Sequence, residues 1–211
     1  MQVNRDNNRM KLIVMTQPTF FVEEDKILTS LFDEGLDCLH LHKPGSSPMY
    51  AERLLTLLSD DCHSKIVVHD HFYLKEEYKL RGIHIDDSNT PIPQGYKGKI
   101  SRTCTRIDDL KEVKRHVDYV FLKSIFDSQT QTNEKSSFTA NQLENAAKKG
   151  LIDRHVYALG GMNIDNLRWA KNLGFGGVVI CGDLWNRFNI HQELDYKALI
   201  AHFEKIRKII G

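Results

Sequence analysis

The sequence is poor in cysteine, and no two of its cysteines lie close together along the chain. Cys38, Cys62, Cys104 and Cys181 are scattered through 211 residues and form no Cys-x-x-Cys motif. In a chain of this size such spacing is typical of reduced thiols and does not fit a disulfide framework.

Long hydrophobic runs are also missing. No apolar stretch approaches the roughly 18 residues that a membrane-spanning helix needs, and the polar residues 1–9 lack the apolar core of a signal peptide. We therefore expect a cytoplasmic protein that does not bind membranes. Residues 1–9 are either a polar N-terminal arm or an extension upstream of a start at Met10, and the sequence leaves both open.

Neither sign of charge is in excess. The 29 Lys and Arg residues offset 28 Asp and Glu residues, which leaves a formal net charge of +1. This balance excludes the strong basic field by which many proteins attract nucleic acid or an anionic membrane. Because the chain contains no internal repeat, low-complexity tract or linker, residues 10–211 are predicted to form one domain. The oligomeric state is not readable from the sequence.

What the sequence does contain is a regular alternation of short apolar runs and longer amphipathic segments. The eight candidate strands are Leu12–Met15, Cys38–Leu41, Ile66–Val68, Gly82–Ile85, Ile100–Thr103, Tyr119–Leu122, Val156–Leu159 and Gly177–Cys181. Helical periodicity is clearest over 163–173 and 196–210, and a further helix is expected over 49–58. Alternating strands and helices predict a parallel α/β sheet, because parallel strands need a crossover. Eight such units in about 200 residues favour a closed (β/α)8 TIM barrel over a doubly wound sheet.

One connection departs from this alternation. Residues 87–98, between the fourth and fifth candidate strands, contain Pro91 and Pro93 and show no helical periodicity. They predict a loop in place of a helix.

Histidines gather at the predicted carboxyl ends of the strands, where barrels of this type carry their active groups. Five of the ten histidines lie there, namely His40, His42, His69, His71 and His84. A single histidine at such a place is more often a hydrogen-bonded filler, but several polar groups at one rim need a reason to be there.

Glycine-containing turns after the last two candidate strands predict a phosphate site. Gly160-Gly161 follows the seventh strand and Cys181-Gly182 closes the eighth, each before a helical segment. Glycine lets a backbone N–H approach a ligand, helix N-termini attract anions, and barrels often bind phosphate between these two loops. The alternative is that these glycines only make tight turns.

At this point four segments resemble one family. The segments Ile66-Val-Val-His-Asp70, Gly82-Ile-His-Ile85, Tyr157-Ala-Leu-Gly-Gly-Met-Asn-Ile-Asp-Asn166 and Leu173-Gly-Phe-Gly-Gly-Val-Val178 are similar to successive strand motifs of the thiamine phosphate synthases. The resemblance extends from about residue 11 to residue 210. It implies an enzyme of thiamine biosynthesis that joins hydroxymethylpyrimidine diphosphate to a thiazole phosphate and releases diphosphate, with the C–O bond breaking first.

The resemblance also implies roles for particular residues. Asp70 matches a metal-binding aspartate for Mg²⁺, although it would also suit a helix N-cap. The second metal ligand is Asn89 by direct counting, or Asp86 or Asp87 after a small loop shift. Thr103 matches a serine that contacts diphosphate. The thiazole phosphate is expected on the backbone of Gly160, Gly161, Cys181 and Gly182.

Other positions depart from the family pattern. Where the family has Gln-x-Arg-x-Lys, this chain has His40-Leu-His42-Lys43-Pro44, and His69 stands in place of an Asn. Lys43 is displaced by one residue, and neighbouring strand residues point to opposite faces, so it is not an automatic replacement. The loop motif Pro-Thr-x-Thr-Lys is replaced by Asp127–Gln131, with Lys135 the nearest lysine. We expect His42 and Lys135 to replace the lost diphosphate contacts, and loop 127–138 to form either a lid or a plain solvated loop.

These departures keep three alternatives open. A thiazole tautomerase would bind a thiazole phosphate only, but Ser124 stands where that enzyme has its acid/base histidine, so His40, His42 or His69 would transfer the proton. A metal-dependent hydrolase would use the pair of His40 and His42 on one strand face as ligands of one metal. A catalytically inactive phosphate-binding barrel would keep only the glycine site.

Overall fold

The computed structural model describes residues 9–211, except for residues 88, 131–132, 134, 188 and 190–192. Residues 1–8, which make up most of the predicted arm, lie outside the described residues. Arg9 forms an ion pair with Asp37. The same carboxylate accepts a hydrogen bond of 2.9 Å from the backbone N–H of Leu12, which fastens the start of the first strand.

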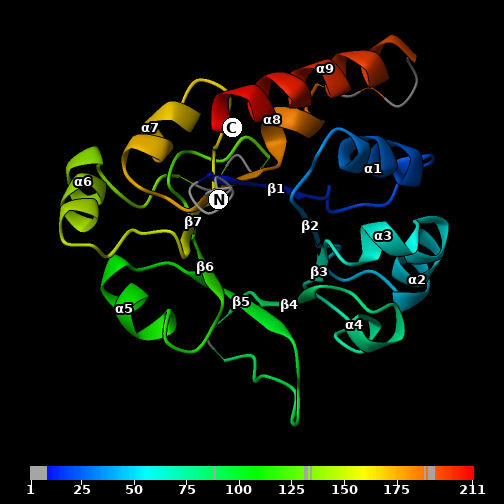
Figure 1. Ribbon diagram of the computed structural model, residues 1–211, viewed down its shortest axis with the longest axis horizontal. Helices are drawn as coiled ribbons and strands as arrows, with labels where there is room; N and C mark the ends of the chain where they lie inside the picture. Colours follow the sequence, from blue (N-terminus) through cyan, green and yellow to red (C-terminus); the bar gives the residue numbers. More distant parts are fainter. Residues whose placement is uncertain (1–8, 88, 131–132, 134, 188, 190–192) are drawn as a thin grey trace, which may run out of the picture.

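Eight parallel strands close into a barrel in chain order, from β1 round to β8 and back to β1 (Figure 1). Their bounds are β1 Lys11–Met15, β2 Cys38–Leu41, β3 Ile66–Val68, β4 Gly82–Ile85, β5 Lys99–Cys104, β6 Tyr119–Leu122, β7 Val156–Ala158 and β8 Gly177–Ile180. The predicted (β/α)8 barrel is confirmed, and the doubly wound alternative is wrong because β8 pairs with β1.

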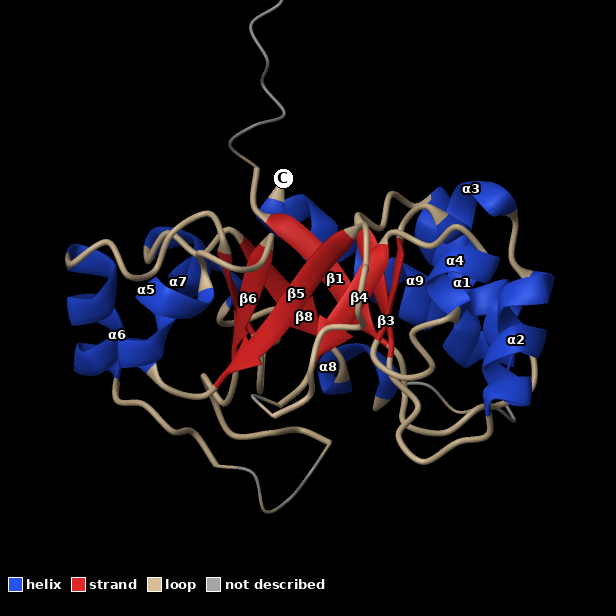
Figure 2. Cartoon of the chain, turned by 90° about the horizontal axis from the view of Figure 1, so that it is seen from below, coloured by secondary structure: helices blue, strands red, loops and turns tan. Residues whose placement is uncertain are grey.

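Helices surround the strands (Figures 1 and 2). They are α1 Glu24–Asp33, α2 Pro48–Leu57, α3 Asp60–His63, α4 Leu74–Glu77, the 3-10 turn η2 Ile107–Asp109, α5 Leu110–Val113, α6 Ala140–Lys148, α7 Leu167–Asn172, α8 Gly182–Trp185 and α9 Glu193–Ile210. The helices predicted over 49–58 and 196–210 correspond to α2 and α9. As predicted, the described residues between β4 and β5 form no helix.

Burial explains why these segments form these elements. Strands β2, β4, β6 and β8 are buried along their whole length, as expected for parallel strands covered by helices on one side and barrel contents on the other. Helix α6 begins with a capping box, in which the Thr139 side chain accepts from the Gln142 backbone N–H and the Gln142 side chain accepts from Thr139 N–H. A second, smaller cluster of buried apolar side chains is formed by Ile13, Cys38, Val67, Tyr119, Phe121 and Val179.

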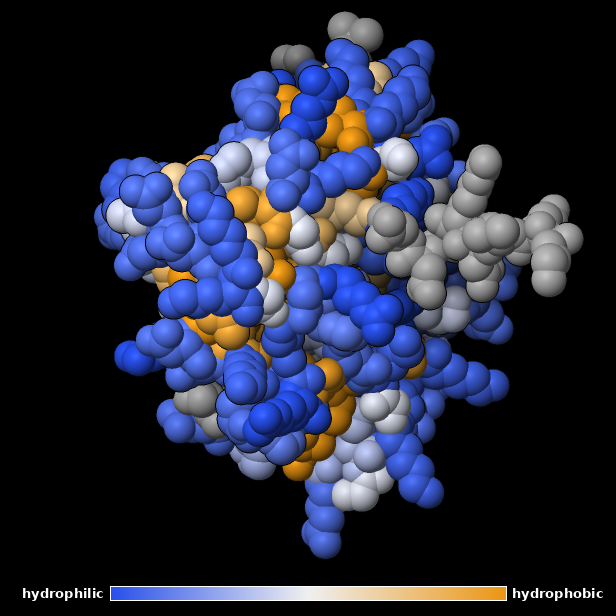
Figure 3. Space-filling view, turned by 60° about the vertical axis from the view of Figure 1, so that its left-hand side comes forward, coloured by the Kyte–Doolittle hydropathy of each residue, from blue (hydrophilic) through white to orange (hydrophobic). Residues whose placement is uncertain are grey.

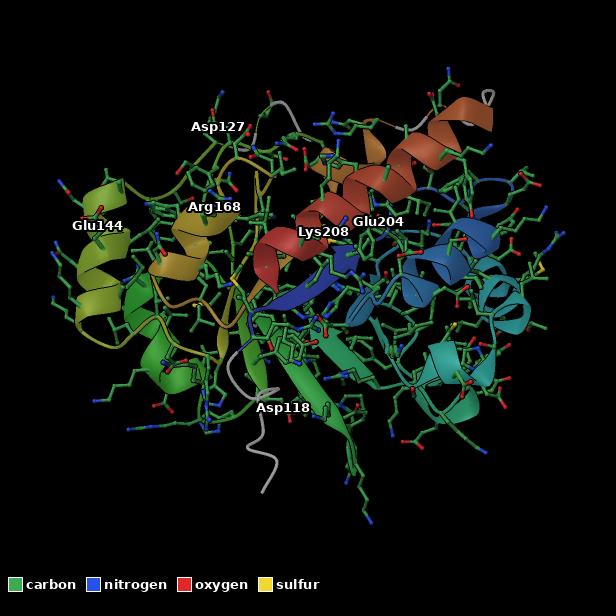
Figure 4. All side chains as sticks on the ribbon, turned by 45° about the horizontal axis from the view of Figure 1, so that its top comes forward. Asp118, Asp127, Glu144, Arg168, Glu204 and Lys208 are labelled. Atoms are coloured by element: carbon green, nitrogen blue, oxygen red, sulfur yellow. The ribbon has the colours of Figure 1, made fainter. Side chains whose placement is uncertain are left out.

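Two further observations describe the outside of the molecule. No helix in the described part of the chain is long and apolar enough to cross a membrane. On the face that carries α5, α6 and α7, hydrophobic atoms show mainly between hydrophilic side chains (Figure 3). Figure 4 places Asp118 and Asp127 on opposite sides of the barrel, as expected for residues that precede and follow β6. The side of Asp127 carries the long loops in which the site lies.

Candidate active site

A cavity of about 280 Å³ opens at the carboxyl ends of the strands. Its lining includes many of the predicted site residues together with apolar and loop side chains. The lining residues are Met15, His42, Asp86, Thr103, Lys123, Ser128, Gln129, Thr130, Leu159, Gly160, Gly161, Met162, Val179, Cys181 and Gly182. The two glycine turns form one wall, while His42 and Asp86 directly follow strands β2 and β4 and Thr103 lies in β5.

The glycine wall is built by close packing of the loop after β6. Gly161 has a φ of +61°, and a Cβ added there would lie 2.3 Å from the carbonyl oxygen of Asp127. A Cβ on Gly182 would lie 2.7 Å from the Cβ of Gln129. The side-chain amide of Asn166 donates to the carbonyl of Gly161 at 3.0 Å and holds this turn in place. Any side chain at either glycine would displace the loop that covers the cavity.

The opposite wall rests on a buried chain of hydrogen bonds inside the barrel. His40 Nε2 lies 2.7 Å from the Tyr119 hydroxyl, and His40 Nδ1 lies 2.8 Å from His69 Nε2. His69 Nδ1 lies 2.9 Å from a carboxylate oxygen of Asp86. The chain therefore runs from the interior of the barrel to a residue that lines the cavity.

The direction of these hydrogen bonds follows from Asp86. Burial lowers the pKa of His69 and holds the pKa of His40 well below its usual value, so both imidazoles are neutral and carry one N–H each. A carboxylate only accepts, so His69 Nδ1–H donates to Asp86. His69 Nε2 then accepts from His40, and His40 accepts from Tyr119. Each of these three hydrogen bonds therefore has its donor on the side of Tyr119 and its acceptor on the side of Asp86.

A third buried histidine positions Thr103. His84 Nδ1 lies 2.7 Å from the Ser101 hydroxyl, and His84 Nε2 lies 2.9 Å from the Thr103 hydroxyl. The His84 ring stacks on His69 with 4.3 Å between the centroids. Burial also lowers the pKa of His84 well below its usual value. Both ring nitrogens of His84 are thus engaged, and the Thr103 hydroxyl is held at the cavity wall.

His42 and Asp70 stand out because each has an unpartnered buried atom. His42 Nδ1 and Asp70 Oδ2 form no hydrogen bond with the described residues, and they lie 3.7 Å apart. His42 Nδ1 also lies 3.9 Å from Asp86 Oδ2. The nearby His42 imidazole keeps the pKa of Asp70 below its ordinary value. Asp70 is not a helix cap, because α4 begins at Leu74 and Tyr73 holds its N-cap position.

Several predicted residues lie away from the cavity. Asp87 accepts hydrogen bonds from Asn89 N–H and Thr90, and neither Asp87 nor Asn89 is among the described residues that line the cavity. Lys135 is exposed and forms an ion pair of 2.9 Å with Asp127, labelled in Figure 4 on the loop after β6. The predicted lid itself contributes Ser128, Gln129 and Thr130 to the cavity, while residues 131, 132 and 134 lie outside the described residues.

Two lysines near the site, Lys43 and Lys123, have different surroundings. Lys43 turns away from the cavity, as the displaced register predicts, and its ammonium pairs with Glu24 at 2.6 Å. Lys123 lines the cavity, whereas its neighbour Ser124, which stands at the position of the tautomerase histidine, is not among the lining residues. Side chains alternate along a strand, and Phe121 faces the interior, so Lys123 follows on the same face. That alternation is the signal that points to Lys123.

The arrangement required by the hydrolase alternative is not present among the described residues. His40 groups with His69 and His84, while His42 groups with His69 and Asp86. Both ring nitrogens of His40 are engaged by His69 and Tyr119, so His40 and His42 do not face one metal position together.

Comparison with known proteins gives a consistent result. Residues 12–184 match the family model described as thiamine monophosphate synthase. A crystal structure of thiamine phosphate pyrophosphorylase from Bacteroides thetaiotaomicron is 50% identical, with a TM-score of 0.87 over 95% of this chain and 97% of that chain.

Two curated relatives are more distant. A thiamine-phosphate synthase of Fusobacterium nucleatum is 26% identical over 121 residues, which span 53% of this chain and 56% of that protein. A thiamine-phosphate synthase of Staphylococcus saprophyticus is 22% identical over 175 residues, or 78% of this chain and 82% of that protein. The resemblance found in the strand motifs is confirmed, and the chain belongs to the thiamine monophosphate synthase family.

Proposed function

We propose that this protein is a thiamine phosphate synthase, a transferase that joins hydroxymethylpyrimidine diphosphate to thiazole phosphate and releases diphosphate. The observation that carries the proposal is the cavity of two unlike walls in a chain of this family. One wall is a glycine cradle suited to a phosphate monoester. The other gathers Lys123, the Thr103 hydroxyl and the Asp86 carboxylate, which suit a diphosphate and its cation.

The thiazole phosphate would bind against the backbone of Gly160, Gly161, Cys181 and Gly182. The helix α8 begins at Gly182, so its first N–H groups have no acceptor within the helix. Backbone N–H groups at glycines approach phosphate oxygens closely. This end of the cavity would fix the thiazole ring with its nitrogen toward the opposite wall.

The diphosphate would bind at the strand wall, where Lys123 and the Thr103 hydroxyl contact the cavity. Departure of diphosphate breaks the C–O bond and leaves a pyrimidine cation, and the thiazole nitrogen donates its electron pair to form the new C–N bond. Such a step depends on stabilising the leaving group and needs no general base. His84, which is hydrogen-bonded to the Thr103 hydroxyl, would hold that hydroxyl toward the diphosphate.

The donor set at this wall fits a divalent cation such as Mg²⁺, the metal that the family implies. Asp70 Oδ2 is buried and forms no hydrogen bond with the residues that the structure describes, and Asp86 lines the cavity. Carboxylate oxygens are the ligands that Mg²⁺ prefers. When bound, the cation would neutralise charge on the diphosphate. Asp86, which lines the cavity, and Asp70, whose Oδ2 lies 3.7 Å from His42 Nδ1, would hold it, whereas Asp87 accepts hydrogen bonds from Asn89 and Thr90 in its own loop.

The experiment is to incubate the purified protein with both substrates and Mg²⁺ and to measure thiamine phosphate. We expect turnover that falls at least about 100-fold in Asp70→Ala, while the same change at exposed Asp165 leaves it unchanged. Interconversion of thiazole phosphate isomers without coupling would instead support a tautomerase. Saturable thiazole phosphate binding without any reaction would support an inactive phosphate-binding barrel.

A further inference from the structure

Four side chains at the strand wall form a cluster whose chemistry differs from that of a carboxylate-only magnesium site. His42, His69 and Asp86 each place one potential ligand atom within 4.8 Å of the others. Asp70 joins them through the 3.7 Å separation between its Oδ2 and His42 Nδ1. The cluster therefore offers two imidazole nitrogens and two carboxylates, which we call the His42–Asp86 cluster.

We infer that the His42–Asp86 cluster binds a first-row transition-metal dication, of the zinc or cobalt kind, more tightly than it binds Mg²⁺. The inference rests on the proposed metal site and adds His42 and His69 to its ligands. Imidazole nitrogen is a good ligand for Zn²⁺, Co²⁺ and Fe²⁺, whereas Mg²⁺ favours oxygen ligands and retains water.

The distances within the cluster suit one shared ion. Two ligand atoms about 2.1 Å from a tetrahedral metal lie about 3.4 Å apart. The structure places His69 Nδ1 at 2.9 Å from Asp86 Oδ2, and His42 Nδ1 at 3.9 Å from the same oxygen. These separations lie on either side of that spacing, so small side-chain rotations would suffice to place the three atoms around one ion. Within the described part of the chain, neither His42 Nδ1 nor Asp70 Oδ2 forms a hydrogen bond.

The surroundings of His69 support its use as a ligand. Its Nε2 is held by His40 at 2.8 Å, so the ring is oriented with Nδ1 toward Asp86 and the cavity. With a metal on Nδ1, the His69 proton would move to Nε2, which would then donate to His40 Nδ1, while His40 Nε2–H would donate to Tyr119. Metal-binding histidines are commonly held by such a donated second N–H, which fixes the ring orientation and raises affinity. His40 and His84 also have both nitrogens engaged, but by imidazole and hydroxyl partners within the barrel, whereas the partner of His69 Nδ1 is a carboxylate of the cluster itself. The second histidine cluster, His40–His69–His84, is therefore occupied by its own hydrogen bonds.

The test uses the full chain without a polyhistidine tag, stripped with a chelator and titrated with Co²⁺. Visible absorption reports nitrogen and oxygen ligation independently of any turnover, and competition with Mg²⁺ and Zn²⁺ gives relative affinities. We expect Co²⁺ to bind at least about 100-fold more tightly than Mg²⁺. His42→Asn should weaken Co²⁺ binding at least about tenfold and change Mg²⁺ binding less than about threefold.

His69→Asn should act in the same direction, and His116→Ala, at an exposed histidine paired with Glu112, should leave both affinities unchanged. His42 is the decisive position, because its Nδ1 forms no hydrogen bond with the described residues. Equal affinity for Co²⁺ and Mg²⁺, or Co²⁺ binding unaffected by His42→Asn, would overturn the inference. Tight Co²⁺ binding, with no coupling of the two substrates in the presence of any of these metals, would refute the proposed reaction alone. Coupling with Mg²⁺ but no preference for Co²⁺ would refute the inference alone.

Discussion

Replacing Lys43 by Met tests whether this lysine serves the fold or the substrate. Its side chain is 2% exposed and that of Glu24 is 1% exposed, with 2.6 Å between Nζ and Oε1. Lys43 also donates to the Thr19 carbonyl at 2.9 Å and lies over the Phe20 ring, 4.5 Å from its centroid. Removing the ammonium takes away the charged partner of the buried Glu24 carboxylate, whose second oxygen forms no hydrogen bond with the described residues. Loss of one partner from such a pair costs about 3–5 kcal/mol.

The loss should depend on pH in a definite direction. Burial raises the pKa of Glu24 and Lys43 opposes this, so the pKa rises further once the lysine is gone. A carboxyl group whose pKa is higher in the folded than in the unfolded state contributes its full stability at pH values below the unfolded-state pKa. That contribution is lost as the pH rises through the folded-state pKa. The deficit of Lys43→Met should therefore be larger at pH 7 than at pH 5, by up to about 1.4 kcal/mol per pH unit.

The assay is urea unfolding followed by circular dichroism at both pH values. The double variant Glu24→Met with Lys43→Met should recover most of the lost stability, because two apolar side chains of similar volume replace the pair. A deficit below about 1 kcal/mol, or one that the double variant does not relieve, would refute this reasoning. A folded Lys43→Met protein that loses substrate affinity would mean that Lys43 serves the site.

Three further predictions concern the cavity and its support. Gly161→Ala should weaken thiazole phosphate binding at least about tenfold by calorimetry, since the new Cβ would meet the Asp127 carbonyl at a strained φ; unchanged affinity would contradict the glycine cradle. Lys123→Ala should lower kcat/KM about 10- to 100-fold, and Lys135→Ala less than about threefold; the opposite order would show that the loop after β6 closes over the substrate. His40→Leu should lower the free energy of unfolding by about 2–4 kcal/mol, because Tyr119 and His69 lose their buried hydrogen-bond partner. Thermal melting measures this loss, and an unchanged melting temperature would show that the buried hydrogen bonds of His40 are dispensable for stability.

The strands could be predicted from the sequence because each is a short run of apolar residues between amphipathic segments. The predicted runs ending at Leu159 and Cys181 extend one residue beyond β7 and β8, since the chain turns there into the glycine loops. The missing helix between β4 and β5 was equally predictable, because prolines and absent periodicity both oppose a helix.

The site was only partly predictable, for reasons that differ between residues. The glycine wall follows from composition, since Gly161 and Gly182 mark close backbone approach. Asp86 and Lys123 could be separated from Asp87 and Ser124 by side-chain alternation along β4 and β6. The depth of His40 could not be predicted, because its partner Tyr119 comes from a strand 79 residues away in the sequence.

The most direct test of the central claim is the stoichiometry of the proposed coupling. Hydroxymethylpyrimidine diphosphate and thiazole phosphate would be mixed with excess metal-loaded protein, and thiamine phosphate and diphosphate quantified together over one turnover. The account predicts that both products appear in equal amounts and at equal rates, and only when both substrates are present. Saturable binding of thiazole phosphate with no thiamine phosphate formed, whichever divalent metal is supplied, would contradict it.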